Sequence, residues 1–493
     1  VTISVTLFFV LMGLYGKLSY YPLRWSDAFY STNSFASAIT INPVHYLIDT
    51  FRAGNKKPYD EKIVREHYDE IASFLGVAAS ERKPFNYTRV VYPTKAIGAS
   101  PNIVLIQLES FSYQKTGLYG SSLNATPYFN ELAKKGLFFN NYFAPHWGTA
   151  RAVFTSVTGI PDVETHNTST RNPVIICQHT IINAFTGYDK FYFLGGSASW
   201  GNIRGLLSNN IHDLVIYEEG SYPVAGGIAP PRVDVWGISD LALFEEANRV
   251  LKQKQDKPFF AIIQTAGNHR PYTIPKDNNR FQVLSPDSAT LEKMGFESAD
   301  EFNAFRFLDH SIGLFMEMAR KETYFDNTLF VFFGDHGTMA GRGELTPRWE
   351  PDLNLTGFHV PFLIYAPKLI SEGKVYSKLS GHPDILPTLA GLTKNQYQNT
   401  TMGRDLLDLN LDTRRAAFTI THGTVSEIGL LEDNYYFLMN DDGTHKRLNR
   451  RDSDSPREDI LLQFPQQADK MEHLLRGIHE TSKYMLYHNN DCK

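Results

Sequence analysis

The chain has 493 residues, which at about 150 residues per domain suggests two or three domains, or one large α/β domain with additions. Its 42% hydrophobic and 20% charged residues exclude a disordered, collagenous or coiled-coil chain. The net charge of −5 provides no general attraction to nucleic acid. With only two cysteines, Cys177 and Cys492, a disulfide framework and a cysteine-based zinc site are excluded.

Residues 1–16 carry no charge and are followed by aromatic and basic side chains. This pattern predicts the end of a membrane helix over residues 1–19 and a juxtamembrane connector over 20–100. A full span needs about 20 apolar residues, and the chain begins with Val1, so we expect an upstream part. A signal-peptide core and a buried helix are the alternatives.

From residue 101 onward, short apolar runs alternate with helical patterns. The runs lie at 102–110, 137–143, 190–194, 258–267, 328–337 and 360–367. Nearly continuous apolar strands separated by helices predict an α/β fold whose mainly parallel central sheet is covered on both faces. We expect this domain to cover 101–410. Shorter strands and an amphipathic helix near 465–487 should complete it over 411–493.

Ligands of such folds collect beyond the carboxyl ends of the strands, which draws attention to the polar residues that end these runs. Glu109 follows one apolar run, and Asp335 and His336 follow another. A carboxylate at the end of a buried strand is costly unless it is paired or binds a metal. Two carboxylates and an imidazole suit a divalent cation, although strand-end acids often only cap a turn.

Thr149 follows Gly148 at the start of a helical pattern. The structural interpretation places Thr149 at or near the N-cap of that helix. The functional interpretation makes its hydroxyl a nucleophile, activated by a divalent ion that lowers the pKa of a bound oxygen.

Taken in order, these motifs resemble the alkaline phosphatase superfamily. They are a strand ending in LES (108–110), a Gly-Thr helix start (148–149), Asn-His (268–269), a late DHG (335–337), HVP (359–361) and HPDILPTLAG (382–391). Within the superfamily the chain is similar to the lipoteichoic acid synthase and phosphoglycerol transferase branch over residues 100–400. Members of this branch carry the domain outside the cytoplasm, after several membrane helices.

The resemblance implies that Glu109, Thr149, Asp335 and His336 bind one divalent metal and that Thr149 is the nucleophile. The resemblance implies manganese as the first choice of ion, because lipoteichoic acid synthases hold manganese with a similar set of ligands. Zinc and magnesium also suit the ligands.

The resemblance also implies residues on the substrate side of the site. His269 and His359 are expected to protonate the leaving oxygen or to hold the phosphate, with a surface role for His269 and a structural role for His359 as alternatives. Trp200 and Arg204 lie where members of the branch have an aromatic residue and an arginine that bind glycerol phosphate. Their spacing departs from the Trp-x-Arg pattern of the branch, which leaves Asn202 as an alternative to Arg204. Arg151 is a further candidate for binding phosphate.

The expected function is transfer of glycerol phosphate from a phosphatidylglycerol-type lipid to a glycan or glycerol-phosphate hydroxyl, through a phospho-threonine intermediate. The alternatives are a phosphoethanolamine transferase, a phosphodiesterase or sulfatase-like hydrolase, and a non-catalytic envelope binding protein. A sulfatase needs Cys or Ser at the nucleophile position, which disfavours that activity. We expect the domain on the extracytoplasmic side of a membrane.

Overall fold

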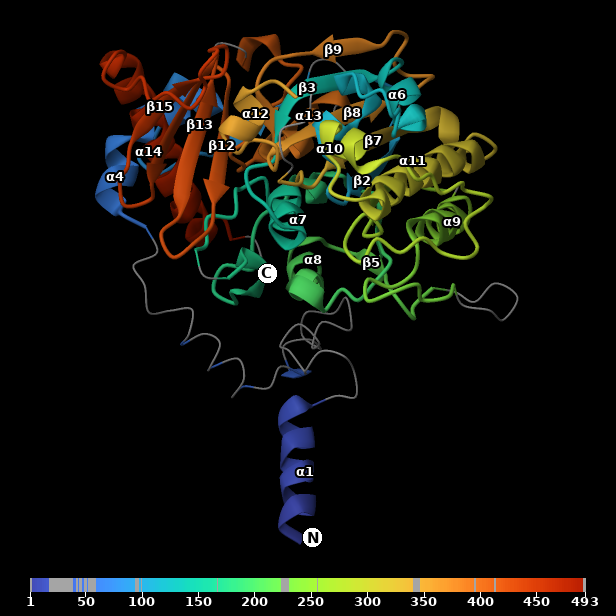
Figure 1. The fold of residues 1–493 in the computed structure, drawn as a ribbon. Coiled ribbons are helices and arrows are strands. Elements are labelled where there is room, and N and C mark those ends of the chain that lie inside the picture. Colours follow the sequence, from blue (N-terminus) through green and yellow to red (C-terminus); the bar gives the residue numbers. More distant parts are fainter. Residues whose placement is uncertain are drawn as a thin grey trace.

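The computed structural model describes residues 2–16, 59–93, 97–98, 100–165, 167–222, 230–254, 256–339, 346–393, 396–411 and 414–490, together with 39–40, 43, 47 and 51. Within these residues, the largest element is a 9-stranded sheet at the centre of the body (Figure 1). A 4-stranded sheet and a 2-stranded sheet accompany it.

The central sheet has the strand order β10-β3-β8-β7-β2-β6-β4-β5, and β9 pairs with β3. The strands are β2 (Asn102–Leu108), β3 (Leu137–Phe143), β4 (Asp189–Leu194), β5 (Leu214–Tyr217), β6 (Phe259–Gln264), β7 (Thr328–Gly334), β8 (His359–Tyr365), β9 (Lys374–Tyr376) and β10 (Ser380–Gly381). All of these pairs are parallel except the two that β8 makes with β7 and β3.

The sheet is therefore mixed, and the expectation of a mainly parallel sheet holds for every described strand except β8. Parallel neighbours need a long crossover, usually a helix that covers the sheet face. The connection from β7 to β8 carries only the 4-residue helix α12 (Trp349–Asp352) in its described part, so β8 returns alongside β7 in the opposite direction.

Helices cover both faces of the central sheet, as predicted. α6 (Pro127–Ala133), α9 (Asp240–Leu251), α10 (Ser288–Lys293) and α11 (Ala299–Ala319) pack on one face, and α7 (Thr149–Thr158), α8 (Ile203–Asn210) and α13 (Ile385–Thr393) pack on the other. Successive residues of β2 alternate between the two cores: Ile103 belongs to one and Val104 to the other. This alternation follows from the two-residue period of a strand, and it explains why β2 is apolar throughout.

The C-terminal residues form a second layer beside the first. β12 (Ala416–Thr421), β13 (Glu427–Glu432), β14 (Tyr435–Asn440) and β15 (Arg447–Arg450) make an antiparallel sheet. The long helix α14 (Pro465–His488) packs on β13 and agrees with the predicted helix near 465–487.

Part of the segment expected as a juxtamembrane connector is folded against this C-terminal layer. α4 (Glu61–Glu66) and α5 (Tyr68–Leu75) pack on α14, and α4 lies beside α14 in Figure 1. β1 (Arg89–Val91) pairs with β11 (Tyr397–Asn399). Residues 59–93 are thus an integral part of the folded body.

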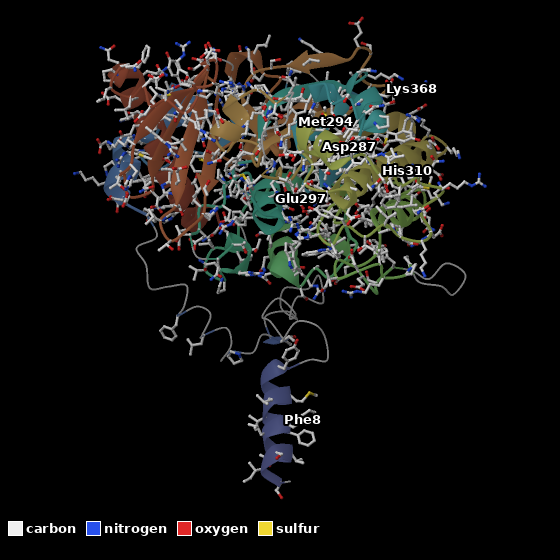
Figure 2. All side chains as sticks on the ribbon, viewed as in Figure 1. Phe8, Asp287, Met294, Glu297, His310 and Lys368 are labelled. Carbon is white, nitrogen blue, oxygen red and sulfur yellow. The ribbon has the colours of Figure 1, made fainter. Side chains whose placement is uncertain are left out.

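Helix α1 (Thr2–Tyr15) has 14 residues, and its apolar side chains are exposed, as Figure 2 shows for Phe8. This exposure contradicts the alternative of a buried core helix. Among the described residues, no helix has the length and apolarity of a membrane span. Most of residues 17–58 lies outside the described part.

Candidate active site

Two carboxylates meet where β2 and β7 end. These strands are parallel neighbours with Leu108 opposite Gly334, so the next residues, Glu109 and Asp335, emerge side by side at the same edge of the sheet. Both carboxylates are buried. Asp335 accepts a hydrogen bond from the backbone N–H of Ser110 at 2.8 Å, which joins the two strand ends.

Thr149 reaches these carboxylates from the first turn of α7. Its Oγ1 donates a hydrogen bond to Glu109 Oε2 at 3.0 Å, although the two residues are 40 positions apart. The N-cap of α7 is Gly148, with φ 98° and ψ 127°, and α7 has no side-chain cap. Thr149 is therefore the first helical residue and not the cap, and its hydroxyl points into the cluster.

The side chains of Glu109, Asp335 and His336 converge like the ligands of a cation. One ligand atom from each lies within 4.8 Å of the others. His336 Nε2 is 3.9 Å from Glu109 Oε1 and 3.6 Å from Asp335 Oδ2. Asp335 Oδ2 is buried and has no hydrogen-bond partner among the described residues.

A buried, unpartnered carboxylate oxygen is costly, and a divalent cation would remove that cost. Two carboxylates, an imidazole and a hydroxyl are hard-to-borderline donors that suit such a cation. The four residues that the sequence predicts as metal ligands therefore come together, and they fit the expected ion.

The electrostatics of the cluster point in the same direction. Burial, with a further contribution from the carboxylate of Glu109, raises the pKa of Asp335 to about 7. Burial lowers the pKa of His336, but the charges of Asp335 and Glu109 outweigh it, so this pKa lies above its ordinary value. The cluster thus concentrates negative charge in a buried place, where a cation would hold both carboxylates ionised.

Residues that follow the strands hold the cluster in position. Thr265 Oγ1 accepts a hydrogen bond from the N–H of Glu109 at 2.9 Å, and Asn268 Nδ2 donates to the Glu109 carbonyl at 3.0 Å. His336 Nδ1 contacts the Gly337 carbonyl at 2.9 Å, so it carries the proton and leaves the Nε2 lone pair for a ligand. The sequence analysis did not assign Thr265, although its place among the polar residues that end the apolar run 258–267 was a usable signal.

A cavity of about 330 Å³ opens next to this cluster. Glu109 and Thr149 line it, together with three residues predicted on the substrate side: Trp200, Arg204 and His269. Its volume is within the range of sites that hold small ligands.

His269 and Trp236 form one wall of the cavity. Their rings lie 4.2 Å apart between centroids, and His269 Nδ1 contacts the carbonyl of Arg270 at 2.9 Å. Trp236 also packs edge-on against Trp200 at 5.7 Å. The sequence analysis missed Trp236, and its motif Asp-Val-Trp-Gly (234–237) follows no strand that would have drawn attention to it.

Arg204 lines the cavity but already has partners. Its guanidinium pairs with Glu218 and donates to Ser199 Oγ at 3.2 Å. Arg232, which the sequence analysis also missed, lines the cavity and pairs with Glu219 at 2.7 Å. Each of these two arginines could therefore bind a phosphate only alongside its carboxylate partner or after releasing it.

Three other candidates do not line this cavity. Arg151 contacts Asp162 at 3.0 Å and the Glu164 carbonyl at 2.9 Å, so its guanidinium supports a loop. The side-chain amide of Asn202 donates a hydrogen bond to the Thr170 carbonyl.

His359 is buried, with Nδ1 2.9 Å from Glu350 Oε1 and Nε2 2.9 Å from the Asn140 carbonyl. Arg151 and His359 thus lie outside the cavity lining, and both side chains make structural hydrogen bonds, which for His359 agrees with the alternative of a structural role.

Comparison with known proteins identifies the class. The family model described as Sulfatase matches residues 101–395, more than half of the chain. The chain therefore belongs to the sulfatase family and carries a sulfatase domain of the alkaline phosphatase superfamily.

Two curated relatives differ in activity. A lipoteichoic acid synthase of Staphylococcus saprophyticus is 28% identical over 364 residues, which are 66% of this chain and 51% of that protein. An ulvan-active sulfatase of Formosa agariphila is 30% identical over 192 residues, 36% of this chain and 37% of that protein. The matched regions thus cover about half or less of these relatives.

Two solved structures show the same fold. A protein of the alkaline phosphatase superfamily from Vibrio parahaemolyticus has a TM-score of 0.68 at 22% identity, covering 87% of this chain and 97% of its own. The lipoteichoic acid synthase LtaP of Listeria monocytogenes has a TM-score of 0.64 at 16% identity, covering 86% and 99%.

Proposed function

We propose that this sulfatase-family domain is a metal-dependent phosphoglycerol transferase that uses Thr149 as its nucleophile. The observation that carries the proposal is the hydrogen bond from the Thr149 hydroxyl to Glu109, inside a cluster of side chains that could hold a cation at the edge of a cavity. The similarity to lipoteichoic acid synthases over 66% of the chain supports this choice of reaction.

Glu109, Thr149, Asp335 and His336 would hold the cation, with manganese proposed ahead of zinc and magnesium. When bound, it would lower the pKa of the Thr149 hydroxyl and neutralise phosphate charge. The cavity would receive the glycerol phosphate head group of a phosphatidylglycerol-type lipid, with its phosphate near Arg204 and its glycerol against Trp200.

In the proposed reaction, Thr149 Oγ1 passes its proton toward Glu109 and attacks phosphorus. The bond from phosphorus to the diacylglycerol oxygen breaks, and His269 gives that oxygen a proton. Glycerophosphoryl-Thr149 remains. A glycan or glycerol-phosphate hydroxyl then gives its proton to His269 and attacks phosphorus, the bond from phosphorus to Thr149 Oγ1 breaks, and that oxygen takes back the proton from Glu109. Two easier displacements replace one difficult step.

A hydrolase of the same family is the second candidate, favoured by the 30% identity to an ulvan-active sulfatase. Thr149 argues against sulfatase chemistry, which needs Cys or Ser at this position. A phosphodiesterase that transfers the phosphoryl group to water remains compatible with the cluster. Transfer and hydrolysis differ in their product: the first elongates an acceptor, and the second releases free glycerol phosphate.

We place the domain on the extracytoplasmic side of a membrane. The exposed apolar residues of α1 would suit a lipid environment, and Cys177 is disulfide-bonded, which is typical of oxidising compartments. This location would bring the cavity to the lipid donor.

Mass spectrometry of the chain incubated with phosphatidylglycerol and Mn²⁺ tests the proposal. We expect a glycerophosphoryl adduct on Thr149 and release of diacylglycerol. Thr149→Ala should abolish both, whereas Thr149→Ser, which keeps the hydroxyl, should retain the adduct. Diacylglycerol release by Thr149→Ala at the wild-type rate would refute the mechanism. A Thr149 adduct that only water resolves would favour the hydrolase.

A further inference from the structure

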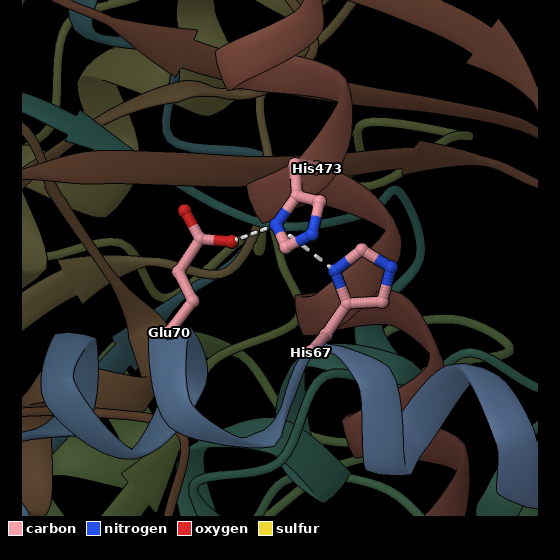
Figure 3. Close-up of side chains that lie close together, drawn as sticks. All are labelled: His67, Glu70 and His473. Atoms are coloured by element: carbon pink, nitrogen blue, oxygen red, sulfur yellow. Dashed lines mark hydrogen bonds and ion pairs between the residues drawn. The ribbon is translucent and has the colours of Figure 1, made fainter.

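A second cluster of ligand-type side chains, none of which lines the cavity, lies between helices α4 and α5 and helix α14 (Figure 3). His67 stands at the junction of α4 and α5, Glu70 lies in the first turn of α5, and His473 comes from α14. One ligand atom from each lies within 4.8 Å of the others. His67 and His473 are 406 positions apart in the chain.

The three side chains point at one another. His67 Nδ1 and His473 Nδ1 are 3.1 Å apart, and His473 Nδ1 also contacts Glu70 Oε2. Figure 3 shows both contacts meeting at the same nitrogen. His67 is 4% exposed, whereas the side chain of His473 is 47% exposed, so the cluster has one open side.

Hydrogen bonds satisfy this arrangement only in part. A ring nitrogen either carries a proton and donates, or carries a lone pair and accepts. If His473 Nδ1 donates to Glu70, its single hydrogen reaches His67 Nδ1 only as a weaker three-centre contact. If His473 Nδ1 instead accepts a hydrogen bond from His67, its lone pair faces a lone pair of the Glu70 carboxylate. A cation among the three atoms resolves the conflict, because each of them then contributes a lone pair.

We propose that His67, Glu70 and His473 bind a zinc ion. Zinc takes imidazole nitrogen at about 2.0–2.1 Å and carboxylate oxygen at about 2.0–2.2 Å, so ligands on adjacent corners of a tetrahedron stand roughly 3.4 Å apart. The 3.1 Å between the two imidazole nitrogens is close to that spacing. The open side at His473 leaves room for water as the fourth ligand.

The nearby charges leave Glu70 available to the ion. Arg414 contacts Glu70 Oε1 at 2.8 Å, while the other oxygen, Oε2, faces His473. Arg414 also pairs with Glu432, and Arg476 pairs with Glu472 at 2.7 Å. Both arginines near the cluster are therefore bound by carboxylates of their own.

The packing of the helices fixes the approach of the ligands. Gly477, one turn after His473 on α14, faces α5 so closely that an added Cβ would lie 2.8 Å from Ile71 and 3.1 Å from His67 Cβ. The missing side chain lets the helices approach until His473 meets His67. The zinc ion would act as a structural clamp that joins residues 61–75 to the C-terminal helix.

Zinc content measures the site directly. The chain is stripped with a chelator, reloaded with zinc, freed of excess ion and analysed by inductively coupled plasma mass spectrometry. We expect His473→Ala and Glu70→Gln each to contain one zinc equivalent fewer per chain than the wild type. His488→Ala, which removes an exposed histidine of the same helix, should keep the wild-type content.

Hydrogen exchange provides a second readout that is independent of the active-site cluster. Zinc should slow amide exchange over residues 61–75 in the wild type and in His488→Ala, but not in His473→Ala. Equal zinc content in His473→Ala and His488→Ala would overturn the proposal, as would exchange that zinc leaves unchanged in the wild type. Neither result would affect the role proposed for Thr149.

Discussion

His269 and His359 were both expected to serve the reaction, and their surroundings now separate them. His269 lines the cavity and has a backbone contact at Nδ1 only, whereas both nitrogens of His359 contact protein groups away from the cavity. The first environment suits proton transfer, and the second suits the support of a buried corner.

We therefore expect different outcomes for the same substitution at these positions. His269→Gln should lower kcat by about 10²- to 10⁴-fold, the usual contribution of a general acid. His359→Gln should lower the free energy of unfolding by about 1–3 kcal/mol, because a buried hydrogen-bond partner is lost, and should leave kcat close to the wild-type value.

Diacylglycerol release and urea unfolding, both measured on both variants, distinguish these roles. A large loss of kcat in a folded His359→Gln variant would contradict the structural role and indicate that His359 takes part in the reaction.

The start of α7 shows how one element depends on a backbone conformation. Gly148 has φ 98° and ψ 127°, a region that residues with a side chain rarely adopt, and the next residue is Thr149. Glycine is thus required here for its backbone, because an added Cβ would meet no atom within 4 Å.

Gly148→Ala should lower the free energy of unfolding by about 1–3 kcal/mol and reduce activity further by shifting Thr149. Gly187→Ala is the matched control: Gly187 has φ 78°, its added Cβ would also meet no atom within 4 Å, and it lies outside the cavity lining. Urea unfolding should show losses in both variants, with activity retained in Gly187→Ala. Full activity in Gly148→Ala would show that Thr149 does not depend on this turn.

At the scale of the whole molecule, buried histidines make the fold sensitive to acid. His382 is 1% exposed, its Nε2 contacts the Gly334 carbonyl at 3.0 Å, and burial lowers its pKa to about 3. Burial also lowers the pKa of His422 to about 4. The unfolded chain binds protons at these positions below about pH 6.5, while the folded chain does not, so stability is full above that pH and falls as pH decreases.

Asp309 has the opposite effect on the pH dependence of stability. Burial raises its pKa to about 7, so the folded chain binds a proton there more readily than the unfolded chain. The test therefore compares His382→Gln with the wild type. Between pH 6.5 and 5, the wild type should lose about 1–2 kcal/mol more unfolding free energy than this variant. Urea unfolding over this range checks the difference, and the exposed His445→Gln should follow the wild type. Parallel curves for His382→Gln and the wild type would contradict the assignment.

The sequence was sufficient for much of the candidate site because strand ends are visible in it. Glu109 and Asp335 end apolar runs, and parallel strands place their ends at one edge. The direction of β8 was not visible, since its apolar run reads the same either way. The partners of Arg151 and His359 were also hidden, because Asp162 lies in a loop and Glu350 in the short helix α12, and only the tertiary fold brings each of them to its partner.

The docking of α4 and α5 onto α14 also has a consequence for synthesis. The ribosome completes α14, which ends at His488, only after more than 390 residues have followed α5. The apolar face of the N-terminal helices, with Val64 and Ile71 fully buried in the finished fold, has no α14 to pack on during all of that time. The nascent chain therefore carries this apolar surface without its partner helix until α14 has been synthesised.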